Sequence, residues 1–324
     1  MATYLITGAA GFIGSHLAQA LVERGEEVRG FDNFSTGRRE NLAAILPKME
    51  LLAGDLRDFT AVERACKGVD YVLHQGALPS VPRSVKDPRT SHESNINGTF
   101  NLLEAARAAG VKRVLYAASS SAYGNQPGFP RVETMQPRPV APYPVQKAAG
   151  ELYMQSYWQV YGLETVCLRY FNIFGPRQDP ASQYSGVIAR FILQMLGGET
   201  ASGETPTIEG DGQQARDFTY VDNAVSANLL ALAAPAEQVC GRVFNVACGE
   251  KHTINETYAV IAKLTGFGKP AQHVEPRSGD IRVSLADISA AREAFGYAPL
   301  VNFEEGLRRT VEWYRAEYAA RAAQ

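Results

Sequence analysis

Three consecutive serines and a tyrosine–lysine pair are the residues of this chain best suited to acid–base chemistry. The run Ser119–Ser121 closes a strand-like segment, and Tyr143 and Lys147 follow it four positions apart. Because Pro144 fits the first turn of a helix, Tyr143 and Lys147 should face the same side about one turn apart. A phenol with a pKa near 10 becomes a base at neutral pH only if its phenolate is favoured by about 4 kcal/mol, and a lysine cation can contribute to this.

A glycine-rich turn near the N-terminus is typical of a dinucleotide site. Gly8, Gly11 and Gly14 follow an apolar run and open a helix-like segment. Such glycines permit a tight turn, close approach of a pyrophosphate and close packing of helix on strand. Asp32 ends the next strand-like run, where its carboxylate can accept hydrogen bonds from an adenosine ribose and would repel a 2′-phosphate. The pattern predicts NAD rather than NADP.

Two further strand ends complete the predicted cofactor site. Asp55 and Leu56 follow the third strand, where the adenine should lie, and the run Gln75–Ala77 follows the fourth, where small residues let the nicotinamide half pass. The pyridinium of oxidised NAD would add a second positive charge beside Tyr143. Taken singly, the serines could be a turn cluster and Lys147 a solvated amine. Their convergence on one sheet edge favours catalysis.

The elements that must position these residues alternate along the first 170 residues. This alternation predicts an α/β fold with a doubly wound parallel sheet of the Rossmann type. The expected strands are Thr3–Thr7, Val28–Asp32, Leu51–Ala53, Tyr71–His74, Val114–Ala118 and Thr165–Arg169. The expected helices are Phe12–Arg24, Asp58–Cys66, Asn97–Ala109 and Pro144–Tyr161.

The later part of the chain predicts two interleaved domains. Residues 1–171 should form the NAD-binding domain, to which residues 222–248 return as a helix at Asp222–Ala234 and a strand at Val243–Ala247. Residues 172–221 and 249–324 should form a smaller α/β lobe that binds the substrate and ends in a helix at Glu304–Ala320.

Composition excludes several other classes of protein. The 324 residues carry 32 Lys and Arg against 34 Asp and Glu, so neither a nucleic acid nor an anionic membrane is an expected partner. No apolar run approaches the roughly 18 residues that span a bilayer, and no leader precedes the first strand, so we expect a cytoplasmic protein. The four cysteines form no C-x-x-C pair and the five histidines no i, i+4 pair, so no metal site is predicted.

Several longer motifs resemble a known superfamily over nearly the whole chain. TGAAGFIGSHL (7–17), SSSAYG (119–124) and YPVQK (143–147) resemble the extended short-chain dehydrogenases/reductases in order and spacing. Three further motifs resemble the nucleotide-sugar 4-epimerases: LRYFNIFGPRQDP (168–180), EGDGQQARDFTYVDN (209–223) and RSGDIRVSLADI (277–288). With the PSVPRS run (79–84), they are most similar to bacterial UDP-N-acetylglucosamine 4-epimerases of the surface-polysaccharide kind.

This resemblance implies a role for each matching residue. Tyr143 would be the base, Lys147 would tune its pKa, and Ser119 would align with the catalytic hydroxyl, although Ser120 or Ser121 could take its place. The expected cofactor-binding residues are Gly8, Gly11, Phe12, Ile13, Asp32, Asn33, Ser35, Gly37, Asp55, Leu56, Gln75, Gly76, Ala77, Asn95, Tyr143, Lys147 and Tyr170. The expected substrate-binding residues are Ser80, Ser120, Ser121, Asn172, Gln178, Arg216, Arg277, Asp280 and Ser284.

Within the substrate set, the resemblance separates nucleotide from sugar contacts. Asn172 would hold the sugar or a phosphate, and Asp280 would hold the uridine ribose. Arg216 and Arg277 would clamp the diphosphate with planar forks of donors. Proteins of this kind commonly form homodimers, here expected through the helices Asn97–Ala109 and Pro144–Tyr161.

The residue inventory favours 4-epimerisation among the reactions of this superfamily. Dehydratases place Asp-Glu where Ser120 and Ser121 stand, and decarboxylases commonly carry a Glu beside the serines. Ser284 aligns with a bulky tyrosine of epimerases restricted to UDP-glucose and UDP-galactose, so it should leave room for a 2-acetamido group. Glucuronate 4-epimerases tend to have Arg where Asp179 stands. UDP-glucuronate 4-epimerisation or decarboxylation, and a non-catalytic NAD-binding sensor or scaffold, stay open as alternatives.

Overall fold

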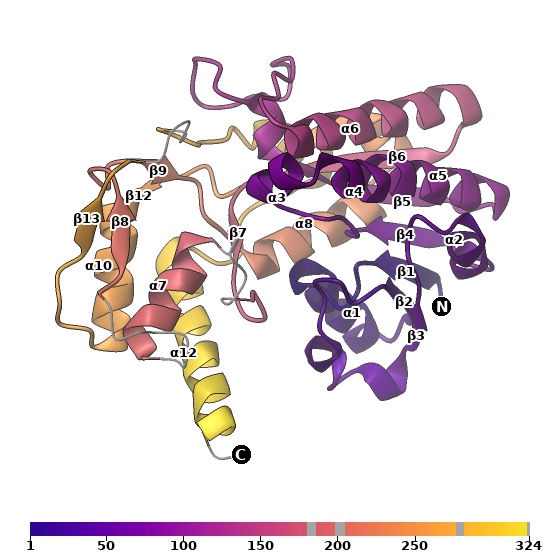
Figure 1. Cartoon of the computed structure of the whole chain (residues 1–324). Coiled ribbons are helices and arrows are strands. Elements are labelled where there is room, and N and C mark those ends of the chain that lie inside the picture. The colour runs from indigo at the N-terminus through magenta and orange to yellow at the C-terminus, as the bar shows by residue number, and fades with distance from the viewer. Residues whose placement is uncertain (180–185, 198–204, 277–281, 323–324) are drawn as a thin grey trace.

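A seven-stranded parallel sheet forms the centre of the larger part of the molecule (Figure 1). The computed structural model describes residues 1–179, 186–197, 205–276 and 282–322, the side chains as far as residue 319. The strand order is β11-β6-β5-β4-β1-β2-β3, and every neighbouring pair is parallel. The strands are β1 Thr3–Thr7, β2 Glu27–Asp32, β3 Glu50–Ala53, β4 Tyr71–His74, β5 Arg113–Ser119, β6 Glu164–Tyr170 and β11 Arg242–Val246. The predicted fold class is confirmed, and the order reverses between β1 and β4, where such sheets bind ligands.

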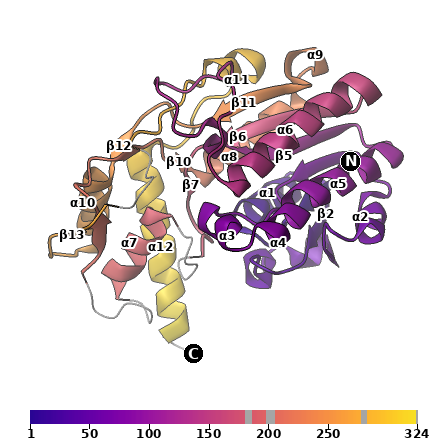
Figure 2. The same ribbon diagram turned by 45° about the horizontal axis from the view of Figure 1, so that its top comes forward.

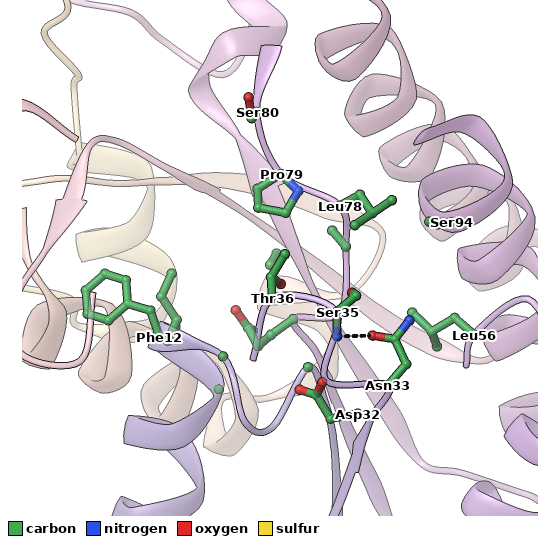
Figure 3. A pocket seen from close by; sticks show the side chains of 18 of the residues that line it. Phe12, Asp32, Asn33, Ser35, Thr36, Leu56, Leu78, Pro79, Ser80 and Ser94 are labelled. Atoms are coloured by element: carbon green, nitrogen blue, oxygen red, sulfur yellow. Dashed lines mark hydrogen bonds between the residues drawn. The ribbon is translucent and has the colours of Figure 1, made fainter. Parts of the chain in front are cut away.

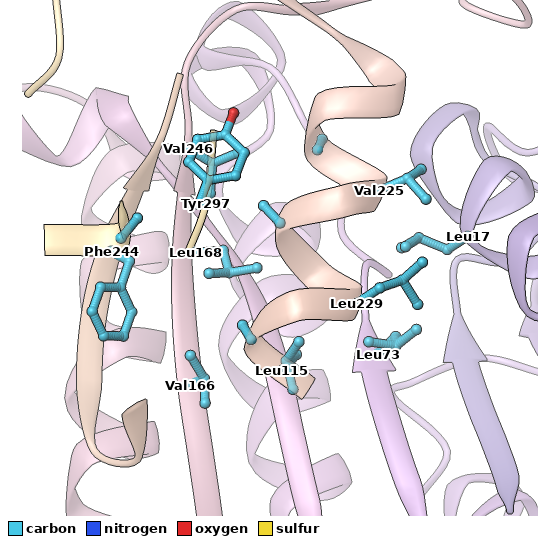
Figure 4. Packing of buried hydrophobic residues seen from close by; sticks show 14 of the residues in the cluster. Leu17, Leu73, Leu115, Val166, Leu168, Val225, Leu229, Phe244, Val246 and Tyr297 are labelled. Carbon is cyan, nitrogen blue, oxygen red and sulfur yellow. The ribbon is translucent and has the colours of Figure 1, made fainter. Parts of the chain in front are cut away.

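Helices cover both faces of this sheet. On one face α2 (Phe59–Cys66), α5 (Gly98–Ala108) and α6 (Pro142–Tyr161) contribute to one apolar cluster. On the other face α1 (Phe12–Glu23) and α8 (Val221–Ala233) pack together over the strands, and α11 (Ser289–Phe295) contacts β11. Figure 4 shows side chains from α1, α8 and the strands meeting in this second cluster. The sheet is therefore buried on both sides, as parallel sheets generally are.

The rest of the described chain forms a separate apolar cluster beside the sheet. Helices α7 (Val187–Leu196), α10 (Ile254–Thr265) and α12 (Phe303–Ala322) supply most of it and lie together in both views (Figures 1 and 2). Short strand pairs complete this part: β7 Ile173–Phe174 with β10 Thr219–Tyr220, β8 Thr207–Glu209 with β13 Gln272–Val274, and β9 Ala215–Arg216 with β12 His252–Thr253. None of the helices in the described part of the chain is both long and apolar enough to cross a membrane. The division into two domains at the boundaries given above stays a prediction.

Several short elements escaped the sequence analysis because each holds only one or two turns. Two of them, α3 (Val81–Lys86) and α4 (Pro88–His92), have a proline in the first turn and side-chain caps from Ser80 and Asp87. A π-helical segment at Glu93–Asn97 leads into α5. The other short helices are Arg39–Leu42, Leu46–Lys48, Ser120–Tyr123 and α9 (Ala236–Val239).

Helix α6 begins at Pro142, two residues before the predicted start, because Pro142 and Pro144 both fit a first turn whose N–H groups need no helical partner. A buried ion pair holds its middle: the Arg169 guanidinium of β6 donates to both carboxylate oxygens of Glu151 at 2.8 and 2.7 Å. Both side chains are almost fully buried. The pair therefore fixes α6 against the sheet one turn after Lys147.

We expect Glu151→Gln to lower the free energy of unfolding by about 3–5 kcal/mol, since removal of one partner leaves the Arg169 charge buried and uncompensated. The matched control is Glu312→Gln, which breaks the solvent-exposed pair with Arg308. That change should cost less than about 0.5 kcal/mol. Urea unfolding of the three proteins measures both effects, and equal stabilities for the two variants would contradict the prediction.

Candidate active site

A cavity of about 720 Å³ opens at the carboxyl ends of β1, β2, β4 and β5. Figure 3 shows Phe12, Asp32, Ser35 and Leu56 around it, with Pro79 on the segment after β4. The predicted cofactor-binding residues that line it are Gly8, Gly11, Phe12, Ile13, Asp32, Asn33, Ser35, Asp55, Leu56, Gln75, Gly76, Ala77, Tyr143, Lys147 and Tyr170. The structure thus brings both predicted constellations, the glycine turn and the tyrosine–lysine pair, to one cavity.

The glycine turn packs so closely that side chains would not fit. A Cβ on Gly14 would lie 2.1 Å from the Gly8 carbonyl oxygen, and one on Gly8 would lie 2.9 Å from the Gly76 Cα. Gly8 also has a φ of +67°, which favours glycine. Helix α1 starts after Gly11 without a side-chain cap, and Gly11 and the first residues of the helix line the cavity, so this N-terminus is open to an anion.

Asp32 is held in place by the same turn. Its carboxylate accepts the Ala10 N–H at 2.9 Å and the Phe34 N–H at 2.7 Å, which leaves lone pairs on both oxygens for further donors. Burial raises the pKa of the carboxyl, and these two hydrogen bonds oppose the rise. Gly37 lies against Asp32 rather than in the cavity wall, and a Cβ on it would come within 2.9 Å of a carboxylate oxygen. Gly37 thus makes room for the acid and is not itself at the wall.

Gln75 lines the cavity, and the nitrogen of its side-chain amide is buried without a partner. The side-chain oxygen of Gln75 accepts the Tyr170 hydroxyl at 3.3 Å, whereas its Nε2 has no hydrogen-bond partner. A buried donor of this kind is usually satisfied by a ligand or water. The closely packed turn, the open helix N-terminus and this amide fit the phosphates and ribose of a dinucleotide.

Asn95 lies behind the cavity wall and not in it. Its side chain accepts the Leu78 N–H at 2.7 Å and donates to the Leu78 carbonyl at 3.0 Å and to Gln146 at 2.8 Å. These bonds use the amide fully, so Asn95 shapes the segment that lines the cavity instead of presenting a group to it.

Tyr143 and Lys147 lie on α6 next to the end of β5. The Lys147 ammonium donates to the Ala117 carbonyl at 2.7 Å and lies 4.7 Å from the centre of the Tyr116 ring. Burial lowers the pKa of Lys147 to about 8. Burial also raises the pKa of Tyr143 to about 12, and a hydrogen bond with Ser119 opposes that rise. In the protein alone the pKa of Tyr143 is set by burial and by the Ser119 hydrogen bond, and the expected lowering by Lys147 together with bound NAD stays a prediction.

The serines differ in what they contact. Ser119 meets Tyr143, and its hydroxyl oxygen lies 2.8 Å from that of Ser121 and accepts the Ser121 N–H at 3.2 Å. Ser120 begins the short helix Ser120–Tyr123. Among the three, Ser119 is the hydroxyl that the structure places against the tyrosine.

A second cavity of about 230 Å³ lies in the smaller part of the molecule, and Asn172, Gln178 and Arg216 line it. Gln178 borders both cavities. The Asn172 amide donates to the Asp217 carbonyl at 3.1 Å. Arg277 and Asp280 lie outside the described residues.

Of the predicted substrate-binding serines Ser80 and Ser284, only Ser80 lines a cavity. Ser80 lines the first cavity in a strained conformation, with a φ of +105°, and caps α3 by accepting the Arg83 N–H at 3.2 Å. Ser284 donates its N–H to the Ala215 carbonyl at 3.0 Å, next to Arg216 in sequence. It is not among the described residues that line either cavity.

Charged residues reach the first cavity from distant loops, and of these Arg38 and Arg177 were not among the predicted site residues. Arg38 follows β2 and forms an ion pair of 2.9 Å with Asp179, which follows β7. Arg177 also lines the cavity and has one buried guanidinium nitrogen without a partner. The GPRQDP motif (175–180) could have indicated Arg177 as a site residue. Which cavity its side chains face, however, depends on how the two parts of the chain pack together.

A Rossmann-type sheet whose switch point carries the glycine turn, Asp32 and a Ser–Tyr–Lys set defines a nicotinamide-dinucleotide enzyme. The model of the NAD dependent epimerase/dehydratase family matches residues 4–247, and the chain belongs to this family. A UDP-glucose 4-epimerase of Mycolicibacterium smegmatis is 39% identical over 316 residues, which are 96% of this chain and 98% of that protein.

Two solved structures are similar over almost their whole length. A UDP-N-acetylglucosamine 4-epimerase of Methanobrevibacter ruminantium, in complex with UDP-N-acetylmuramic acid, is 40% identical with a TM-score of 0.90 and covers 98% of this chain and 99% of its own. A Thermus thermophilus UDP-glucose 4-epimerase in complex with NAD is 39% identical with a TM-score of 0.84 and covers 97% and 99%. The expected nucleotide-sugar 4-epimerase family, NAD cofactor and isomerase activity are confirmed. Because near-equal identities accompany different hexoses in these names, similarity does not select the sugar.

We expect Gly14→Ala to lower the free energy of unfolding by about 1–3 kcal/mol, because overpacking displaces the Gly8 backbone. The same displacement should empty the purified protein of most of its NAD. Gly268→Ala is the matched control, since nothing lies within 4 Å of the added Cβ. Urea unfolding and the NAD content of the purified proteins measure the two effects. Wild-type NAD content in Gly14→Ala would contradict the prediction.

Proposed function

We propose that this enzyme interconverts UDP-N-acetylglucosamine and UDP-N-acetylgalactosamine through a 4-keto sugar and also accepts UDP-glucose and UDP-galactose. The observation that carries the proposal is that Tyr143 and Lys147 line the cavity formed by the glycine turn and Asp32, and that Ser119 is hydrogen-bonded to Tyr143. The same site would suit cytoplasmic production of amino-sugar nucleotides for surface polysaccharides, as the resemblance to that kind of epimerase implies.

The cofactor-binding residues named above would hold NAD across the first cavity. The helix α1 N-terminus would bind the pyrophosphate, Asp32 the adenosine ribose, and the unpartnered Gln75 amide the nicotinamide half. When bound, NAD supplies a hydride acceptor for carbon 4 of the sugar and a positive charge beside Tyr143. Gly37 and Asn95 would act behind the wall, by seating Asp32 and Leu78.

Tyr143 would take the proton from the 4-hydroxyl and return it to the 4-oxygen, while the hydride removed from carbon 4 would return to the opposite face of that carbon. The pKa of about 12 in the protein alone is too high for a base at neutral pH, so the positive charges of Lys147 and of bound NAD would have to lower it. Ser119 would bridge the sugar hydroxyl and the tyrosine. Lys147, whose ammonium is fixed on the Ala117 carbonyl, would orient the nicotinamide ribose and add charge.

The substrate would extend from this cavity into the second one. Gln178 borders both, and Asn172 and Arg216 line the second, which suits the diphosphate and nucleoside of a UDP-sugar. Ser80, Ser120 and Ser121 would contact the sugar, while Arg277 and Asp280 are assigned to the nucleotide by the resemblance alone. Asp179 in the first wall is paired with Arg38, so its charge gives no argument against a glucuronate carboxylate, and the choice of an uncharged hexose is assigned by the resemblance alone.

We expect Tyr143→Phe to keep the fold and bound NAD but to lower turnover by about 10²- to 10⁴-fold, the usual contribution of a general base. Product formation from UDP-N-acetylglucosamine, UDP-glucose and UDP-glucuronate, each tested without added NAD, measures the effect and identifies the sugar. A variant with near-wild-type turnover would remove Tyr143 from the mechanism, and UDP-glucuronate as the sole substrate would overturn the proposed hexose.

Ser284→Tyr tests the choice of an N-acetylated sugar. An added ring should cost about 1–3 kcal/mol if it meets the acetamido group, which is about 5- to 150-fold in turnover of UDP-N-acetylglucosamine, while turnover of UDP-glucose survives. Kinetics measured in parallel on UDP-N-acetylglucosamine and UDP-glucose show whether Ser284 faces the acetamido group. Equal loss on both sugars, or no loss on either, would show that Ser284 does not face the acetamido group.

A homodimer through α5 and α6 is the assembly that we propose. Large apolar side chains are exposed along these helices, among them Phe100 at 41%, Leu152 at 66% and Val160 at 66%. Leu152→Glu should convert the dimer to a monomer in analytical ultracentrifugation, because a charge would be buried at the interface. Leu300→Glu is the control, since Leu300 is similarly exposed, at 70%, and its N–H is bonded to Asn223 of α8. An unchanged mass for Leu152→Glu would contradict this interface.

A further inference from the structure

The first turn of α6 has one N–H group that the helix cannot satisfy. Pro142 and Pro144 have no N–H, and the Val145 N–H donates to the Ala141 carbonyl at 3.2 Å. Ala141 provides no side-chain cap. The Tyr143 N–H is therefore the single donor of this turn that needs a partner from elsewhere.

Ser84 supplies that partner from another helix. Its hydroxyl oxygen accepts the Tyr143 N–H at 3.0 Å and donates its own proton to the Val81 carbonyl at 2.7 Å. Since Ser84 is fully buried, no water competes for either bond. The single proton of the hydroxyl is committed to Val81, so a lone pair is fixed toward the backbone of Tyr143.

The helix that carries Ser84 also borders the first cavity. Ser80 caps α3 by accepting the Arg83 N–H, and both residues line the cavity. One turn after Ser80, the Ser84 hydroxyl meets the catalytic helix. Helix α3 thus connects the cavity wall to the backbone of Tyr143: the Ser80–Arg83 hydrogen bond lies at the wall, and the hydrogen bond from the Tyr143 N–H to Ser84 lies one turn further along the helix.

We propose that Ser84 is a positioning residue that sets the place of Tyr143 relative to Ser119 and the sugar, an inference that rests on the proposed role of Tyr143 as the base. Without the hydroxyl, the Tyr143 N–H is left buried and unpaired, and the first turn of α6 shifts to satisfy it. The phenol then moves away from Ser119, while Lys147, one turn further on, keeps its bond to the Ala117 carbonyl. The effect should fall on turnover and spare cofactor binding.

The test compares Ser84→Ala, Ser84→Thr and the control Thr310→Val, which removes an equally buried hydroxyl bonded within α12. We expect Ser84→Ala to lower kcat by about 10- to 100-fold with KM and NAD content near those of the wild type, since a misplacement of about 1 Å at a reacting group can cost 10²-fold. Ser84→Thr keeps the acceptor and should recover most of kcat, and Thr310→Val should leave kcat unchanged.

The pH profile of kcat separates positioning from a general loss of stability. Tyr143 is faced by Ser119 and Tyr116 of β5, by Lys147 of its own helix and by α3, whose Arg83 lines the same cavity. Because the Ser119 hydrogen bond lowers the pKa of Tyr143, its loss should move the rising limb of the profile to higher pH in Ser84→Ala. Thr310→Val should leave that limb in place.

Two results would overturn the proposal. One is that Ser84→Ala keeps the wild-type kcat and the wild-type rising limb of the pH profile while Tyr143→Phe is inactive. The other is that kcat and NAD content fall equally in Ser84→Ala while the rising limb of the pH profile does not move. An active Tyr143→Phe would instead refute the proposed function itself. If Ser84→Ala does not fold, hydrogen exchange at the Tyr143 amide of the wild-type holoenzyme decides: slow exchange is expected, and exchange as fast as in a free peptide would contradict the bond to Ser84.

Discussion

The fixed position of α6 against β5 and β6 is the constraint on which the rest of the site depends. Gly150 allows the contact, because a Cβ there would lie 2.3 Å from the Tyr116 hydroxyl oxygen. The Lys147 bond to Ala117 and the Glu151–Arg169 pair then hold successive turns of the helix on the two strands. Each contact is buried and specific, so the base and the lysine are placed by rigid elements and not by a loop.

A single segment joins the two cavities to this rigid frame. Residues 176–179 follow β7, and the Pro176 carbonyl lies 3.0 Å from the His16 ring of α1, while Asp179 pairs with Arg38. The Tyr314 hydroxyl of α12 donates to the Gln178 carbonyl, between these contacts. Gln178, which borders both cavities, thus lies in a segment that is bonded to α1 of the larger part and to α12 of the smaller part. A ligand that reaches from one cavity to the other would bind to a segment already held in place, which reduces the ordering cost of binding.

Local patterns explain why the sheet and much of the first cavity could be predicted. An apolar run indicates a buried strand from local sequence alone. The spacing from Gly8 to Gly14 indicates the tight turn after the first strand of a Rossmann-type sheet, and the later strands of that sheet follow in a known order. Features that depend on contacts between distant segments were not accessible. The predicted helix start at Asn97 lies one residue before that of α5, but the π-helical segment that precedes α5 was not predicted. Asn95 of that segment bonds to Leu78 and Gln146 and so lies behind the cavity wall instead of in it.

Electrostatics and cross-helix bonds were equally inaccessible to pattern reasoning. The tyrosine–lysine spacing is a local property, but the pKa of Tyr143 follows from burial, and the lysine's bond to Ala117 joins residues 30 positions apart. The bond from Tyr143 to Ser84 spans 59 positions. No sequence motif predicts that Ser84 of α3 contacts the first turn of α6, because this contact forms only when both helices have packed in the fold.

The most direct test of the central claim, that one fixed site both removes hydrogen from carbon 4 of the sugar and returns it, is isotopic. The holoenzyme as purified would be given UDP-N-acetylglucosamine with deuterium at carbon 4, in ordinary water and without added NAD. We expect an epimerised product that keeps the deuterium at carbon 4. Product with hydrogen from the solvent at that carbon, or turnover only with added NAD in proportion to product, would contradict it.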